Sequence, residues 1–326
     1  MKKCLAILLC ALLLTGCTPQ QTQFSANWLD LFDTVTNVTA FADSRDDFYA
    51  QAGEFYDELL RYHQLFDIYK EYDGINNLKT INDAAGAHPV AVDSAIIELL
   101  QDCVGYYEWT DGRVNVAMGS VLALWHEARE TAVLPSSEDL QEAAKHTDIE
   151  KLIIDVENGT VFLADPAMRL DVGAIAKGWA AQKVTETAPD GYLLSVGGNV
   201  CATGPKEKDK PWIVAIQNPD GGDEYLHTLA LSKGSAVTSG DYQRFVEIDG
   251  KKYHHIIDPN TLYPSEFWRS VTVVCADSAL ADALSTALFL LPLEEGKALL
   301  EKTGADAMWL APDGTRYYSD GFVFLS

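Results

Sequence analysis

A segment at residues 170–180, LDVGAIAKGWA, combines an acid, two glycines and a lysine. A helix beginning near Ala174 would leave unpaired N–H groups in its first turn, and these favour an anion. Lys177 would add a positive charge one turn later, and Asp171 lies at the junction. The order differs from the nucleotide loop G-x-x-x-x-G-K-[ST], because the lysine precedes its glycine and tryptophan follows. The segment fits a cradle for a phosphate or polar ring, and also an Asp-capped, closely packed helix start.

A second segment, ADSALADALSTAL at residues 276–288, places a carboxylate and a hydroxyl four residues apart. On a helix, Asp282 and Thr286 would share one face. Both are hard oxygen ligands, and Mg²⁺ commonly combines one or two protein oxygens with the phosphate oxygens of a substrate. An amphipathic helix with an exposed Asp282 and a Thr286 bonded to its own backbone is the other interpretation.

Proton-transfer groups occur in the segment YHHIIDP at residues 253–259. If residues 252–257 form a strand, His255 lies on one face, and Asp258 begins the turn that ends the strand. A histidine and an aspartate near one strand end could move protons, although a histidine pair can also be structural. No H-E-x-x-H motif or cysteine pair accompanies them, so the spacing is not a zinc pattern.

Two further segments contain residues that could contact a ligand. The glycine pair in YLLSVGGNV at residues 192–200 would let a backbone approach a ligand closely, or form a plain hairpin turn. In SGDYQR at residues 239–244, Arg244 could pair with a phosphate or with a structural carboxylate.

The elements that must position these groups mix helices and hairpins. Periodicity predicts helices at residues 46–66, 92–110, 139–145, 174–186 and 278–291. Strands are expected at residues 31–42, 152–155, 160–163, 168–172, 245–248 and 252–257. Hairpin turns are expected at Asp111-Gly112, Asn158-Gly159, Asp249-Gly250 and Asp313-Gly314. The pattern predicts an α+β fold with mixed, largely antiparallel sheets and packed helices, because strands and helices do not alternate regularly. No G-x-G-x-x-G motif supports a dinucleotide fold.

The first residues have the form of an export signal. A short basic start and an apolar stretch at residues 4–14 precede Leu-Thr-Gly-Cys17, which resembles the bacterial lipobox. We expect a signal peptide at residues 1–16, lipidation of Cys17, a tether at residues 17–26 and one catalytic domain at residues 27–326. The protein would then be lipid-anchored on the extracytoplasmic face of the cell membrane. An ordinary secretory signal with a chance cysteine is the alternative.

The chain is strongly acidic, with a formal net charge of −24 over 326 residues. Loss of the leader would leave 22 basic and 48 acidic residues, a charge of −26. Such a surface repels nucleic acid, so no nucleic-acid partner is expected. An anionic ligand would need local positive charge, a metal or a helix N-terminus. Three cysteines outside the leader and position 17 are predicted to be buried free thiols: Cys103, Cys201 and Cys275.

Taken in order, the lipobox and five motifs resemble the ApbE family of FAD:protein FMN transferases. The motifs are D-x-G-x-x-A-K-G, GGN, S-G-x-Y-x-R, H-x-I-D-P and A-D-A-L-S-T. The resemblance runs from about Phe32 to the C-terminus. It implies one α+β catalytic domain that uses Mg²⁺ and FAD. The implied reaction transfers FMN to a Thr or Ser hydroxyl of a target protein and releases AMP.

The resemblance also implies roles for particular residues. FAD would contact Tyr69, Met118, Gly119, Ser120, Asp171, Lys177, Arg244 and Ile256. Mg²⁺ would be bound by the carbonyl oxygen of Ala174 and the side chains of Asp282 and Thr286. His255 would lie beside the reacting phosphate, and either His255 or Asp258 would accept the proton of the target hydroxyl. A tyrosine at position 69 favours transfer over hydrolysis.

Three departures from the family pattern bear on the flavin pocket and not on the metal site. This chain has Phe32-Asp33-Thr34 where the family has M-G-T. It has Ser120 where the family usually has proline, and Leu262 where the family usually has glycine. Two other functions stay open. A Mg²⁺-dependent FAD pyrophosphatase would give FMN and AMP, and a non-catalytic lipoprotein would only bind FAD.

Overall fold

The computed structural model describes residues 21–222, 224–323 and 325. The expected signal peptide and Cys17 lie outside these residues. The first strand begins at Thr22, so residues 22–26, expected to be tether, belong to the folded chain. None of the helices in the described ranges has both the length and the apolar character that a bilayer crossing requires.

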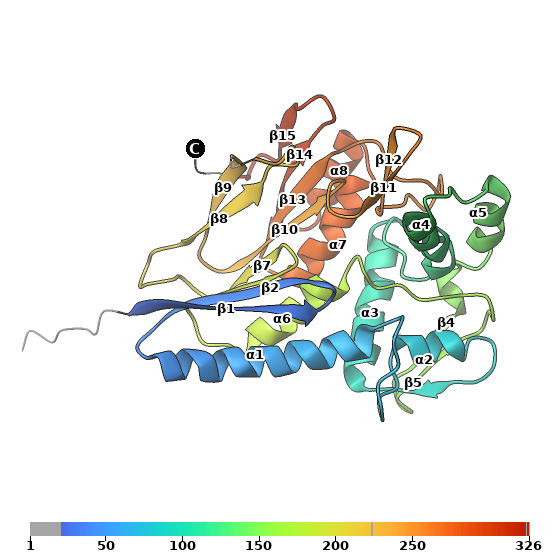
Figure 1. The fold of residues 1–326 in the computed structure, drawn as a ribbon, viewed down its shortest axis with the longest axis horizontal. Helices are drawn as coiled ribbons and strands as arrows, with labels where there is room; N and C mark the ends of the chain where they lie inside the picture. The colour runs from blue at the N-terminus through green and yellow to red at the C-terminus, as the bar shows by residue number, and fades with distance from the viewer. Residues whose placement is uncertain (1–20, 223, 324, 326) are drawn as a thin grey trace, which may run out of the picture.

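An eight-stranded sheet forms the centre of the molecule (Figure 1), and every neighbouring pair in it is antiparallel. In spatial order the strands are β1 (Thr22–Leu31), β2 (Thr34–Ala42), β6 (Tyr192–Val196), β7 (Asn199–Ala202), β10 (Gly234–Gly240), β13 (Ser270–Cys275), β14 (Asp306–Leu310) and β15 (Arg316–Tyr318). Buried side chains alternate along β2, as expected for a strand with one face on the core. The expected α+β fold with antiparallel sheets is confirmed.

Helices pack on this sheet around the main core, which contains side chains from all of them. They are α1 (Arg45–Phe66), α3 (Ser94–Trp109), α6 (Ala176–Glu186), α7 (Ser278–Phe289) and α8 (Leu293–Leu300). Trp179 of α6 lies in this core, with its ring 5.2 Å from that of Tyr62 and 5.4 Å from that of Phe66. Its indole N–H donates to Asp102 at 2.8 Å. The tryptophan after the lysine–glycine pair is therefore a packing residue.

The hairpin of β8 (Trp212–Gln217) and β9 (Tyr225–Leu231) packs against the main sheet through a second core. Side chains along β8 are alternately buried and exposed, because one face of the hairpin covers the sheet and the other faces water.

Smaller elements complete the fold. A three-stranded sheet contains β3 (Val90–Ala91), β5 (Thr160–Leu163) and β4 (Leu152–Asp155), with η1 (Ile149–Lys151) before β4 and α2 (Leu78–Asp83) beside β5. Two helices, α4 (Gly119–Thr131) and α5 (Ser137–Ala144), pack together near the hairpin of β11 (Phe245–Ile248) and β12 (Lys251–His254) (Figure 1).

Several expected elements differ in the structure. Three Asp-Gly or Asn-Gly hairpins form as predicted, but Asp111-Gly112 instead ends α3, where the Gly112 N–H bonds to the Tyr107 carbonyl. The strand expected at residues 168–172 is reduced to one bridge, and the strand expected at residues 252–257 ends at His254. The helix expected from Ala174 begins at Ala176. The described cysteines are free, as predicted, with Cys103 and Cys201 buried and Cys275 only partly so.

Candidate functional site

A cavity of about 740 Å³ lies where the β6–β7 turn, α4, α6 and α7 meet. This volume is within the range of small-molecule sites. Most residues that the sequence selected line it: Tyr69, Met118, Asp171, Ala174, Lys177, Arg244, His255, Ile256, Asp282 and Thr286. Gly119, Ser120 and Asp258 are not among its lining residues. The fold thus gathers motifs that lie more than 200 positions apart in the sequence.

Asp282 is the point where three of these motifs meet. Its Oδ2 atom accepts hydrogen bonds from the backbone N–H of Gly178 at 2.8 Å and from Asn199 Nδ2 at 2.9 Å. Burial raises the pKa of Asp282, while nearby Lys177 and these two donors lower it. The carboxylate is therefore buried and only partly compensated, with Oδ1 taking no part in either bond.

Two glycines make this junction possible. A Cβ atom on Gly178 would lie 2.4 Å from both Asp282 Cβ and the Ser278 carbonyl oxygen, so only glycine lets α6 approach α7 this closely. Gly197 has φ +58°, and its Cβ would meet Thr34 at 2.7 Å. The glycine pair forms a hairpin turn and also directs Asn199 to Asp282. The hairpin interpretation of that segment is confirmed, and the close approach of its backbone to a ligand stays a prediction.

The turn before α6 has its own hydrogen bonds. Asp171 Oδ1 accepts from the Gly173 N–H at 2.9 Å, and Lys177 Nζ donates to the Gly173 carbonyl at 3.2 Å. The N-cap residue, Ile175, offers no side-chain cap. Asp171 therefore caps the turn and not the helix, and it lines the cavity together with Lys177.

Thr286 lies one helical turn after Asp282 and lines the same cavity. Its hydroxyl makes no hydrogen bond with any residue that the structure describes, whereas the Thr185 hydroxyl donates to the Ala181 carbonyl of its own helix. The interpretation with an exposed aspartate is wrong, because Asp282 is 4 % exposed. One carboxylate, one hydroxyl and the Ala174 carbonyl are hard oxygen donors that fit Mg²⁺. The described residues contain no cluster of three or more His, Cys, Asp or Glu that could hold a metal.

His255 directly follows the end of β12 at His254, so it lies outside the observed strand although the predicted strand included it. Its Nδ1 lies 3.3 Å from the Arg244 carbonyl oxygen, which can only accept, so Nδ1 carries the proton and Nε2 has a free lone pair. Burial, followed by the charges of Arg244 and Lys177, lowers the pKa of His255 to about 3. The imidazole is neutral at physiological pH and able to accept a proton.

Asp258 has a different environment. It is 7 % exposed, accepts from the Asn260 N–H at 2.9 Å and forms an ion pair with Arg113 at 3.5 Å. Its backbone also bonds Leu262 and Tyr263. These contacts hold a turn, so the structure favours His255 over Asp258 as the group facing a ligand.

The segment at residues 118–120 reaches the cavity through Met118 alone. Gly119 donates to the Arg169 carbonyl at 3.0 Å, and a Cβ there would lie 2.5 Å from that oxygen. The Ser120 hydroxyl donates to the Ala143 carbonyl at 3.3 Å, toward α5. The expected direct contact of Gly119 and Ser120 with a nucleotide is not supported by this placement.

Two of the three departures from the family pattern, at residues 32–33 and at Leu262, fall at left-handed backbone positions, whereas Ser120 does not. Phe32, Asp33 and Leu262 have φ of +53°, +50° and +65°, in the left-handed region that glycine adopts most easily. Ordinary side chains occupy these turns at some cost in strain, and Phe32 and Asp33 also line the cavity.

Two polar cavity residues on α4, His126 and Arg129, were not predicted from the sequence. The helix itself was not predicted, so no face could be assigned to either side chain. The signal that could have found them is a histidine and an arginine three residues apart, beside a tryptophan, in LWHEAR.

The chain is similar to known proteins over most of its length. The model of the ApbE family matches residues 32–309. A Treponema pallidum (strain Nichols) protein named FAD:protein FMN transferase is 38 % identical over 266 residues, covering 76 % of this chain and 74 % of that protein. A Klebsiella pneumoniae (strain 342) protein of the same name is 34 % identical, covering 78 % and 83 % respectively.

The crystal structure of the ApbE protein from Thermotoga maritima MSB8 superposes with a TM-score of 0.83 at 28 % identity. The match covers 92 % of this chain and 97 % of that one. The family match spans most of the chain and the residues that line the cavity, which run from Phe32 to Leu290. The chain belongs to the ApbE family.

Proposed function

We propose that the cavity is the catalytic centre of an FAD:protein FMN transferase. The observation that carries the proposal is the junction at Asp282, where the α6 glycine, the β6–β7 asparagine and α7 converge on one buried carboxylate. A packing role alone does not require a carboxylate there, because burial opposes its charge. The two relatives described above carry the same activity in their names.

In the proposed reaction, the target hydroxyl oxygen attacks the phosphorus of the FMN half of FAD. The bond from that phosphorus to the bridging oxygen breaks, and AMP leaves with the electron pair. His255 Nε2 takes the hydroxyl proton, which its free lone pair permits. Bound phosphates would raise the pKa of His255 from its value in the free protein, because they offset the charges of Arg244 and Lys177.

Asp282, Thr286 and the Ala174 carbonyl would hold Mg²⁺ at this site. The ion would supply charge neutralisation of the pyrophosphate and of the leaving AMP. Lys177 is a second cation beside the same carboxylate. Local positive charge of this kind lets a protein of net charge −24 accept an anionic dinucleotide.

One assay separates this function from its two rivals. The protein is mixed with FAD, Mg²⁺ and a target protein that has a Thr or Ser acceptor segment. Flavin fluorescence that stays with the target on a denaturing gel, with release of AMP, supports transfer. Free FMN and AMP without labelling would mean hydrolysis, and bound FAD without AMP would mean a binding protein.

We also propose that the mature chain is lipid-anchored at Cys17 on the extracytoplasmic face of the membrane. The support is the lipobox-like sequence that ends in this cysteine. Cys17→Ala should abolish incorporation of labelled fatty acid and move the protein from the membrane fraction to the soluble one. Retention of the variant in membranes after a high-salt wash would contradict the anchor.

A further inference from the structure

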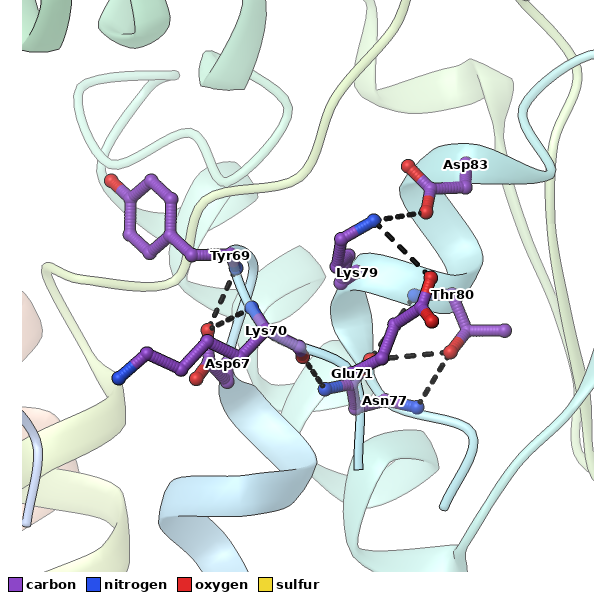
Figure 2. Close-up of polar contacts among 8 residues, drawn as sticks. All are labelled: Asp67, Tyr69, Lys70, Glu71, Asn77, Lys79, Thr80 and Asp83. Carbon is purple, nitrogen blue, oxygen red and sulfur yellow. Dashed lines mark hydrogen bonds and ion pairs between the residues drawn. The ribbon is translucent and has the colours of Figure 1, made fainter. Parts of the chain in front are cut away.

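The loop that carries Tyr69 is fixed through its backbone. Asp67 Oδ1 accepts from the N–H groups of Tyr69 at 2.7 Å and Lys70 at 3.0 Å. Asn77 Nδ2 donates to the Lys70 carbonyl at 2.8 Å. Figure 2 shows this network, with the Tyr69 ring projecting away from it. Because 57 % of Tyr69 is exposed, the ring needs a separate contact to keep one orientation at the cavity.

That contact is His126 on α4. The Tyr69 hydroxyl is hydrogen-bonded to His126 Nδ1, and the two ring centroids are 5.8 Å apart. On the other side of the imidazole, Nε2 lies 3.9 Å from Asp171 Oδ2. This distance suits electrostatic attraction or one bridging water better than a direct hydrogen bond. Three residues from three distant segments therefore lie in one row along the cavity.

The protonation states of Tyr69 and His126 determine which of them donates the hydrogen bond. Burial lowers the pKa of His126 more than Asp171 raises it, so the ring is neutral at physiological pH. Partial burial, with the charge of Asp171, raises the pKa of Tyr69 to about 12, so its hydroxyl keeps the proton. The Tyr69 hydroxyl therefore donates to His126 Nδ1. The proton of the neutral imidazole is then on Nε2, the nitrogen that is nearer Asp171.

His126 is itself held by a well-packed helix. The neighbouring Trp125 is 1 % exposed, donates to the Leu262 carbonyl at 2.9 Å and stacks on Tyr253 with centroids 5.8 Å apart. These contacts fix the rotation of α4 about its axis. His126 is thus the rigid partner of the pair, and Tyr69 is the side chain that it restrains.

We infer that His126 is a positioning residue for FAD. It holds the Tyr69 phenol at one orientation on the cavity wall and ties it to the Asp171 turn, which continues into Ala174. A planar ring system binds more tightly to a wall that is already ordered, because no side-chain freedom is lost on binding. The inference rests on the proposed function, which makes FAD the ligand.

A double-mutant cycle tests the pairing. Tyr69→Phe and His126→Phe should each raise the KM for FAD about 3- to 10-fold, the range for one lost hydrogen bond, with kcat little changed. The double variant should be no worse than either single one, because both remove the same interaction. His126→Gln should recover part of the loss, since its amide oxygen can accept from the phenol.

His146→Phe is the matched control. His146 also pairs with an aspartate, Asp165, at 2.9 Å, but lies outside the cavity-lining residues. It should leave the KM for FAD unchanged. Additive losses in the cycle, or a His126→Phe variant with wild-type KM, would overturn the inference. Thermal unfolding of each variant shows whether it is folded.

The same variants also separate this inference from the proposed function. Affinity for FAD is measured by flavin fluorescence without a target protein. If the wild type binds FAD but labels no target, the transferase proposal fails while the cycle can still be completed on the dissociation constant. If the wild type labels the target and the cycle is additive, only the role of His126 fails.

Discussion

At the scale of single residues, two side chains define the chemistry that the cavity can perform. Asp282 brings a buried, incompletely compensated carboxylate, and His255 brings a neutral imidazole with one free nitrogen. Neither property follows from residue type. Aspartates are normally solvated and ionised, and histidines titrate near 6.5. Both properties come from burial among other charged groups.

Asp282→Asn should abolish Mg²⁺-dependent transfer and yet stabilise the metal-free protein. The folded carboxyl group has a pKa above its ordinary 3.8, so it binds more protons than the unfolded chain. The free energy of unfolding contributed by this group therefore falls as the pH rises through the raised pKa. Urea denaturation in EDTA should show a higher free energy of unfolding for the variant than for the wild type. This difference should be small below pH 3.8, the ordinary pKa of an aspartate, and larger at neutral pH. A variant less stable than wild type at neutral pH would refute the assignment.

His255→Ala should lower kcat by about 10²- to 10⁴-fold, the usual contribution of a positioned base. FAD affinity should change much less. Because the free protein has a His255 pKa of about 3, kcat/KM should not fall as the pH drops through 6.5. Initial rates of target labelling across this range check both statements. A wild-type loss of kcat/KM near 6.5 that disappears in the variant would contradict the low pKa.

At the scale of elements, the site depends on how closely α6 approaches α7. Gly178 supplies both the space and the N–H that binds Asp282. The β6–β7 turn supplies the second donor through Asn199. Helix packing thus requires glycine at position 178, after Lys177. This requirement cannot be recognised if the segment is interpreted as a phosphate-binding loop.

Gly178→Ala should destabilise the protein by about 1–3 kcal/mol, the usual cost of overpacking, and should also impair Mg²⁺-dependent activity. Gly53→Ala in α1 is the control, since an added Cβ there meets no described atom within 4 Å. Its helix propensity predicts a gain of about 0.5–1 kcal/mol. Denaturant unfolding of both variants measures the difference. Equal effects would show that α6 and α7 are not held in contact at this glycine.

At the scale of the whole molecule, the cavity is assembled from residues between Phe32 and Leu290. Its lining comes from the main sheet, the helices on it and the smaller α4 region. A ligand that bridges these parts should stabilise the fold as a unit. The acidic surface makes the local cations of the cavity necessary for any such anion.

FAD and Mg²⁺ together should raise Tm more than the sum of their separate effects. Ligand at 100 times its Kd contributes about 2.7 kcal/mol, or several degrees for a chain of this size. Differential scanning calorimetry of the wild type and Asp282→Asn makes the measurement. In Asp282→Asn, the rise in Tm with both ligands should equal the sum of the two separate rises. A larger rise in this variant would mean that the metal binds elsewhere.

The sequence by itself determined the α+β class, the bounds of five helices within a few residues and most of the motif residues that line the site. These follow from local periodicity, turn chemistry and ordered motifs, which need no distant partner. Tertiary structure alone decided that Asp171 caps a turn, that Asp258 holds another, and that Gly119 and Ser120 do not line the cavity. It also brought His126 to Tyr69 across 57 positions. Such contacts join distant segments, and the pattern of one segment holds no information about what packs against it.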